Sequence, residues 1–121
     1  MLKKRNVQYF FLFFLFTSLH VLVWFGTNWQ LVENVDRTSA LKICIIVSIP
    51  IALLGFHATK IGYSLYESAW SVRLLAFGTS YLIFPLMTWF WLDESPFNLK
   101  TMLCIGLSFS IILIQLILPN S

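Results

Sequence analysis

Four long stretches without a charged residue divide this sequence, and the charged residues lie between them and at the N-terminus. A helix that crosses the hydrocarbon core of a bilayer needs about 20 mostly apolar residues. All four stretches are long enough to do so, the second and the fourth only at the short end of the range. The stretches are residues 6–32, 43–59, 74–92 and 101–118.

The composition indicates that lipid rather than water surrounds these stretches. Hydrophobic residues make up 59% of the chain and charged residues 11%, whereas soluble domains carry about 25% charged residues. A chain this apolar could not cover its surface with polar groups in water. The net charge of +3 is small and concentrated at Lys3, Lys4 and Arg5, so we expect the lipid bilayer and not nucleic acid as a partner.

The apolar stretches predict helices rather than strands. They are too long for strands, they lack strict alternation, and so short a chain cannot close a barrel. We therefore predict an all-α fold: a polytopic membrane protein of four transmembrane helices in an up-down-up-down bundle, with residues 1–121 as one domain. The predicted spans are about 7–31, 41–59, 70–92 and 99–118, joined by short connections at 33–39, 60–68 and 93–97, with Asn98 as a helix N-cap.

The positive charges predict the orientation, because loops on the cytoplasmic side carry more Lys and Arg. With the N-terminus inside, five such residues lie inside and three outside, which predicts a multi-pass protein of the inner cell membrane with both termini cytoplasmic. The inner group is Lys3, Lys4, Arg5, Lys60 and Arg73, and the outer group is Arg37, Lys42 and Lys100. The start of the chain also resembles a signal peptide, but no small-residue cleavage site follows the apolar run, so we expect it to stay as the first helix.

No pattern typical of an enzyme or a metal site occurs. The chain has no Gly-rich phosphate loop, no HExxH and no CxxC motif, and Asp93-Glu94 is its one adjacent carboxylate pair. We therefore expect no enzymatic activity and no cofactor. Cys44 and Cys104 are interpreted as small core side chains, with a disulfide between them as the alternative.

Helices 1 and 3 carry the polar and aromatic positions that predict a binding site. In the first helix, His20, Trp24 and Asn28 fall on one stripe with Thr17 and Thr27. Polar groups in hydrocarbon should face protein or water, so this stripe predicts either hydrogen bonds between helices or the wall of a cavity. His20 lies in the middle third of its span, where it could relay protons or stay neutral and hydrogen-bonded.

The third helix places Trp70, Arg73 and Tyr81 in one sector with Phe77, Ser80, Phe84 and Thr88. Arg73 either reaches the headgroups or Glu67, or it stands as a charge at the cytoplasmic mouth of a cavity. The predicted substrate-binding residues are His20, Trp24, Asn28, Trp70, Arg73 and Tyr81.

Small residues predict how the other two helices pack. One stripe of the second helix carries Cys44, Ser48, Ala52, Gly55, Thr59 and Gly62, interpreted as a face for close approach, and Pro50 is expected to kink this helix. In the fourth helix Gly106 and Ser110 have the small-xxx-small spacing of associating helices, so we predict a dimer interface there.

The layout and several motifs resemble the small multidrug resistance proteins of the drug/metabolite transporter superfamily. The motifs are Ala69-Trp70-Ser71 at the start of the third helix, Thr88–Glu94 at its end, and a Leu/Ile-rich last helix in Asn98–Leu118. Ile51–Tyr63 is similar in hydropathy only. The resemblance implies a homodimer, antiparallel or parallel, in which helices 1 to 3 enclose a substrate chamber and helix 4 holds the dimer.

One departure from that family changes the expected activity. The family's essential membrane-embedded Glu has no counterpart, because residues 6–32 contain no carboxylate. We therefore expect a transporter-like homodimer that moves a small polar or anionic metabolite. The alternatives are a non-transporting subunit or accessory protein of a larger membrane complex and, from a third class, a channel-forming oligomer.

Overall fold

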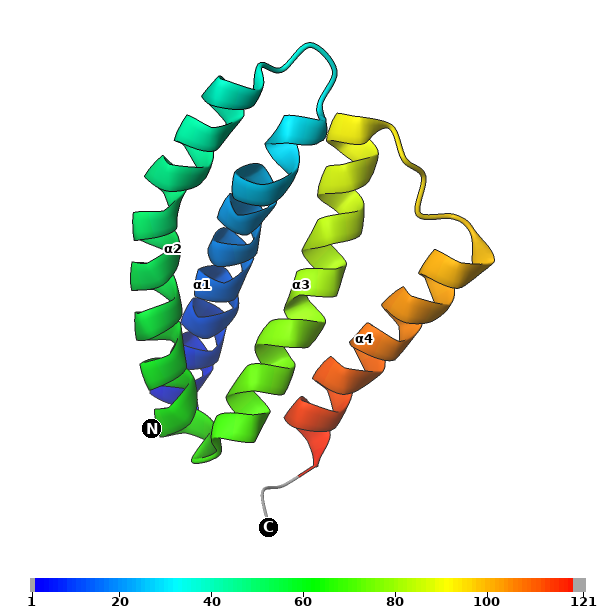
Figure 1. Cartoon of the computed structure of the whole chain (residues 1–121). Helices are drawn as coiled ribbons and strands as arrows, with labels where there is room; N and C mark the ends of the chain where they lie inside the picture. Colours follow the sequence, from blue (N-terminus) through cyan, green and yellow to red (C-terminus); the bar gives the residue numbers. More distant parts are fainter. Residues whose placement is uncertain (1, 119–121) are drawn as a thin grey trace.

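The computed structural model describes residues 2–118, and within them the regular structure is entirely helical. Four α-helices follow one another: α1 (Leu2–Asn28), α2 (Arg37–Tyr66), α3 (Ala69–Leu92) and α4 (Leu99–Ile117), with a short 3-10 helix η1 (Trp29–Leu31) after α1 (Figure 1). All four are long and apolar enough to cross a membrane. The all-α prediction is confirmed, and the helices fit a multi-pass membrane protein.

Local signals in the sequence set the start of three helices. Asp36, Ser68 and Asn98 each accept a hydrogen bond from the backbone N–H three residues later, at the first turns of α2, α3 and α4. Such N-caps satisfy backbone donors that have no partner inside the helix. The N-cap predicted at Asn98 is confirmed, with its Oδ1 2.8 Å from the nitrogen of Thr101.

The second helix extends further than the predicted span of 41–59. It runs without a break from Arg37 through Pro50 to Tyr66, and it is gently bowed in Figure 1. Only Glu67 and Ser68 then separate it from α3, instead of the predicted connection 60–68. Lys60 ends the uncharged stretch but not the helix, which ends where Glu67 takes a left-handed conformation (φ 54°).

The helices lie in the spatial order α2, α1, α3, α4. α1 packs against both α2 and α3, whereas α4 packs against α3 and diverges from it toward residues 93–98 (Figure 1). Close approaches are made at glycines, because a Cβ at Gly62 would lie 2.9 Å from Val72 and one at Gly78 would lie 2.9 Å from Ile112. Backbones can approach this closely only where the side chain is absent.

The small-residue stripe predicted for α2 is only partly the packing face. Gly62 approaches α3, but Ser48, Ala52 and Thr59 are exposed. Gly62 is the one residue of the stripe among the buried residues of α2, which are Ala40, Ala58, Gly62, Leu65 and Tyr66.

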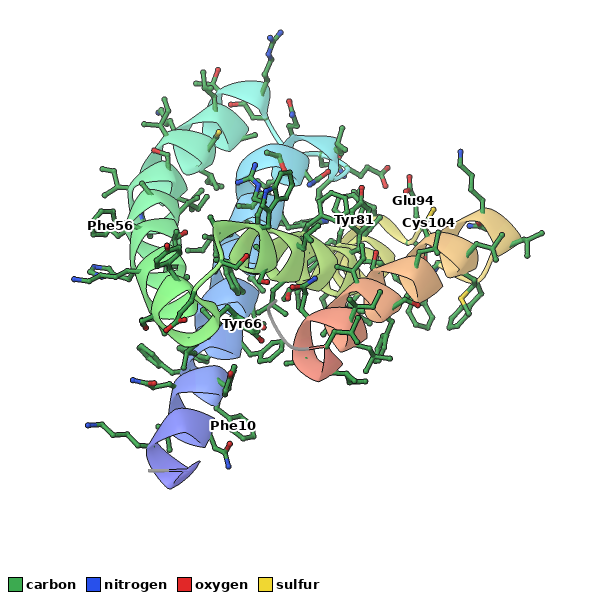
Figure 2. The ribbon with its side chains drawn as sticks, turned by 90° about the horizontal axis from the view of Figure 1, so that it is seen from below. Phe10, Phe56, Tyr66, Tyr81, Glu94 and Cys104 are labelled. Carbon is green, nitrogen blue, oxygen red and sulfur yellow. The ribbon has the colours of Figure 1, made fainter. Side chains whose placement is uncertain are left out.

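The core lies near the α2–α3 connection, and the outside of the molecule is apolar. Leu12, Phe16, Ala58 and Leu75 belong to one buried cluster that joins α1, α2 and α3. Many large hydrophobic side chains face outward, and Figure 2 shows Phe56 pointing away from the other helices (Figure 2). An outer surface of this kind suits lipid as the surrounding solvent.

Candidate functional site

The first hollow lies between α1 and α3, toward the end of the molecule that carries η1. Its volume is about 440 Å³, and we refer to it as the Trp24 hollow. It brings together four of the six predicted substrate-binding residues: His20, Trp24, Asn28 and Tyr81. The full lining is His20, Val23, Trp24, Thr27, Asn28, Phe77, Ser80, Tyr81 and Phe84.

A second hollow continues the first toward the α2–α3 connection. This Arg73 hollow has a volume of about 420 Å³, and α1, α2 and α3 all contribute to it. It shares His20, Phe77 and Ser80 with the Trp24 hollow, so the two form one groove along α3. The lining is Phe16, Leu19, His20, Gly55, Thr59, Ala69, Val72, Arg73, Ala76, Phe77 and Ser80.

Trp70 is the predicted site residue that the structure leaves apart. Its side chain is 77% exposed and lines neither hollow. Trp70 belongs to the first turn of α3, so it precedes the part of the helix that α1 covers. Trp70 therefore lies outside the groove, although it shares a helical sector with Arg73.

His20 stands where the two hollows meet and is held there from both sides. Its Nε2 lies 2.9 Å from the backbone oxygen of Ala76 in α3, a bond in which the ring nitrogen donates. Its ring also stacks on Phe16, with 6.3 Å between centroids and 19° between planes. The hydrogen bond considered for His20 from the sequence is therefore present in the structure.

Trp24 makes the longest-range side-chain bond of the site. Its Nε1 donates to Oγ1 of Thr88 at 3.0 Å, and both side chains are buried. The sequence assigned Trp24 to the first helix and Thr88 to the third, but it did not predict a hydrogen bond between them. A buried indole N–H needs an acceptor. This requirement could have predicted that Trp24 faces a polar side chain of α3.

The other polar residues of the α1 stripe bond within their own helix. The hydroxyl of Thr27 donates to the backbone oxygen of Val23, and Nδ2 of Asn28 donates to the Thr27 hydroxyl at 2.9 Å. Hydrogen bonds between helices, one of the two roles considered for this stripe, are therefore made by His20 and Trp24 rather than by Thr27 and Asn28.

Arg73 supplies the one charge in the groove. Its side chain is exposed, and among the described side chains it has neither an ion pair nor a hydrogen bond. The pairing with Glu67 considered from the sequence is therefore absent. No carboxylate lines either hollow, so the groove is cationic at this end.

A third hollow lies beyond the Trp24 hollow, between α3, α4 and the connection 93–98. This Glu94 hollow has a volume of about 490 Å³ and shares Tyr81 and Phe84 with the Trp24 hollow. Glu94 and Lys100 contribute its charges, and Glu94 and Cys104 are labelled in Figure 2. The sequence did not predict this hollow, because the divergence of α4 from α3 cannot be read from hydropathy.

The predicted interface residues of α4 lie on its outward side. Gly106 and Ser110 are exposed, and a Cβ at Gly106 would meet nothing within 4 Å. Ser108 and Ile112 instead face α3. Both cysteines are free thiols, so the alternative of a disulfide is not realised, and among the described residues no group of His, Cys, Asp and Glu could hold a metal ion.

The geometry of the site is thus an open groove between helices, with one unpaired cation and an otherwise aromatic, aliphatic and small polar lining. Comparison with protein-family models, with curated proteins and with solved structures finds no match.

Proposed function

We propose that this protein is a small transporter-like membrane protein that moves a small polar or anionic metabolite. In this proposal the chain crosses the inner membrane four times, up and down, with both termini in the cytoplasm. Two copies form a homodimer, and the groove along α3 is one copy's share of the substrate chamber.

The observation that carries the proposal is the unpaired Arg73 at one end of the groove. A guanidinium keeps its positive charge at any accessible pH and binds carboxylates or phosphates through two parallel hydrogen bonds. It also repels a cationic substrate, and no carboxylate of the groove lining offsets its charge. A solute held here is therefore anionic or neutral.

Uptake by proteoliposomes tests this proposal. The full chain is reconstituted, a mixture of isotope-labelled small metabolites is added outside, and the trapped solutes are identified by mass spectrometry. We expect uptake of anionic or neutral solutes, with Arg73→Ala lowering it more than Lys60→Ala. Lys60 is a suitable control because it is an exposed cation of α2 that lines neither hollow. Equal uptake by protein-containing and protein-free vesicles would refute transport.

A non-transporting subunit of a larger complex is the second candidate, in which the outward side of α4 would contact another subunit instead of a second copy. That side carries Gly106 and Ser110 without a neighbour in the described chain. Cysteine labelling separates the two candidates in a background without Cys44 and Cys104. A transporter requires that a membrane-impermeant thiol reagent reach Ser80→Cys in the groove, whereas Phe56→Cys on the outside of α2 should stay unlabelled in lipid. Protection of both positions favours the subunit.

A further inference from the structure

The groove formed by the Arg73 and Trp24 hollows changes in character along its length. At the Arg73 end it has a cation without a partner among the described side chains. From Phe77 to Phe84 its wall is mainly aromatic, and no charged residue lines the Trp24 hollow. The groove therefore has a charged end and a long, mainly apolar part with a few small polar groups. A ligand with a charged group and an apolar chain would match this arrangement.

The dimensions of the groove exceed those needed by a very small solute. The two hollows measure about 440 and 420 Å³, and each lies within the range of about 300–1,000 Å³ usual for small-molecule sites. At 1.5 Å per helical residue, Arg73 and Phe84 are about 17 Å apart along α3. A ligand with an extended chain would occupy both hollows at once.

The side chains that border the groove are also open to the surroundings of the helices. Phe77 is 51% exposed, Tyr81 40% and Phe84 45%. Where no second copy covers this flank it meets lipid in a bilayer, and a molecule already dissolved in the membrane then enters the groove from the side.

We infer that the groove binds a single-chain amphiphilic anion from the bilayer, with the acidic group on Arg73 and the chain along Phe77 and Phe84. This inference rests on the proposed function and names its substrate class. Charge-assisted bonds from the guanidinium to a carboxylate supply the selectivity. The chain adds little free energy, because lipid tails are as apolar as the groove. The chain concentrates the ligand in the membrane and aligns it with α3.

Photolabelling of the full chain in phosphatidylcholine liposomes tests the inference. The probe is palmitate with a diazirine in its chain, and the labelled residues are mapped by mass spectrometry. We expect labels within 77–84 of α3 and 20–24 of α1. Arg73→Gln should lower the labelling at least about tenfold, because a hydrogen bond to a charged group contributes about 1.5–3 kcal/mol, whereas Lys60→Gln should leave it unchanged.

Further variants and competitors keep folding and binding apart. Circular dichroism checks that Arg73→Gln retains its helices, and Arg73→Lys should label more than Arg73→Gln but less than the original protein, because it keeps the charge and loses the paired hydrogen bonds. Unlabelled palmitate should displace the probe, and acetate at the same concentration should not. The inference is overturned if the label spreads over outward positions such as Phe10 and Phe56 with equal yield in Arg73→Gln. It is equally overturned if acetate competes as well as palmitate does.

The photolabelling experiment and the uptake experiment can fail separately. Photolabelling measures binding without any flux, whereas proteoliposome uptake measures flux without regard to the chain of the ligand. Competition by acetate would remove the amphiphile and leave a small-anion site, so the proposed function would stand. Specific labelling without uptake of any metabolite would remove transport of small solutes and leave the binding site.

Discussion

The indole nitrogen of Trp24 donates a hydrogen bond to the hydroxyl of Thr88 over 3.0 Å, although the two residues lie 64 positions apart. Trp24 is 1% exposed and Thr88 6%. A donor in apolar surroundings is costly without an acceptor, so this bond favours one rotation of α1 against α3. That rotation also sets which side chains face the Trp24 hollow.

Thr88→Val should destabilise the helical bundle, because it removes the acceptor while keeping the shape of the side chain. We expect a loss of about 1 kcal/mol, since hydrogen bonds between membrane helices are worth about 0.6 kcal/mol on average and at most about 1.7 kcal/mol. Unfolding in mixed micelles with increasing dodecyl sulfate measures the difference. Thr27→Val is the matched control, because the Thr27 hydroxyl is exposed and bonds within α1. Equal unfolding midpoints for Thr88→Val and the control would show that the bond has no such role.

His20→Ala should abolish any dependence of uptake on a proton gradient. His20 lines both hollows of the groove and is the residue there that can exchange a proton near neutral pH. The measurement is proteoliposome uptake with and without an imposed pH gradient. His57→Ala serves as the control, since His57 is exposed on α2 and lines neither hollow. A gradient effect of unchanged size in His20→Ala would assign proton coupling, if any, to another group.

Gly106→Leu should prevent self-association without harm to the fold of one copy. A Cβ at position 106 meets nothing within 4 Å inside the described chain, so we expect the larger side chain to clash with a second copy and not with its own chain. Cross-linking in mild detergent should show fewer dimers with normal membrane insertion. Gly78→Leu is the contrasting variant, because a Cβ there lies 2.9 Å from Ile112 and 3.1 Å from the backbone of Ser108, so folded protein itself should be lost. An unchanged dimer yield in Gly106→Leu would place the interface elsewhere.

Topology reporters should place both termini in the cytoplasm. Fusions at Asp36 and Ser121 should report outside and inside respectively, and replacing Lys3, Lys4 and Arg5 by Ala should weaken the bias that these charges create. The side chains of Lys3 and Arg5, and all of Ser121, lie outside the described part of the structure. A periplasmic signal at Ser121 would contradict the predicted orientation, and mixed signals would indicate dual topology.

The helices themselves could be predicted because hydropathy and capping act locally. Uncharged stretches identified all four helices, and Asn98 identified the start of α4. The end of α2 could not be predicted in the same way, because Lys60 and Ser64 are compatible with a helix that leaves the apolar region. The stop depends instead on the left-handed backbone at Glu67.

The groove could be predicted only where its residues share a helix face. Helical spacing placed His20 with Trp24, and Arg73 with Tyr81, and the structure brings the two sets to one groove. Contacts between helices depend on rotation and tilt, which the spacing leaves open. The Trp24–Thr88 bond, the outward position of Trp70 and the Glu94 hollow were therefore beyond the reach of the sequence.

We expect Arg73, the single charge of the groove, to select against cations. Growth of bacterial cells that overexpress the protein, in the presence of ethidium or methyl viologen, tests it most directly, because export of such cations is what the family resemblance would imply. We predict the same resistance as in cells without the protein, with its presence in the membrane verified. Robust resistance from the intact protein, lost in Glu67→Gln, would contradict the claim and would show that Glu67 supplies the carboxylate absent from α1.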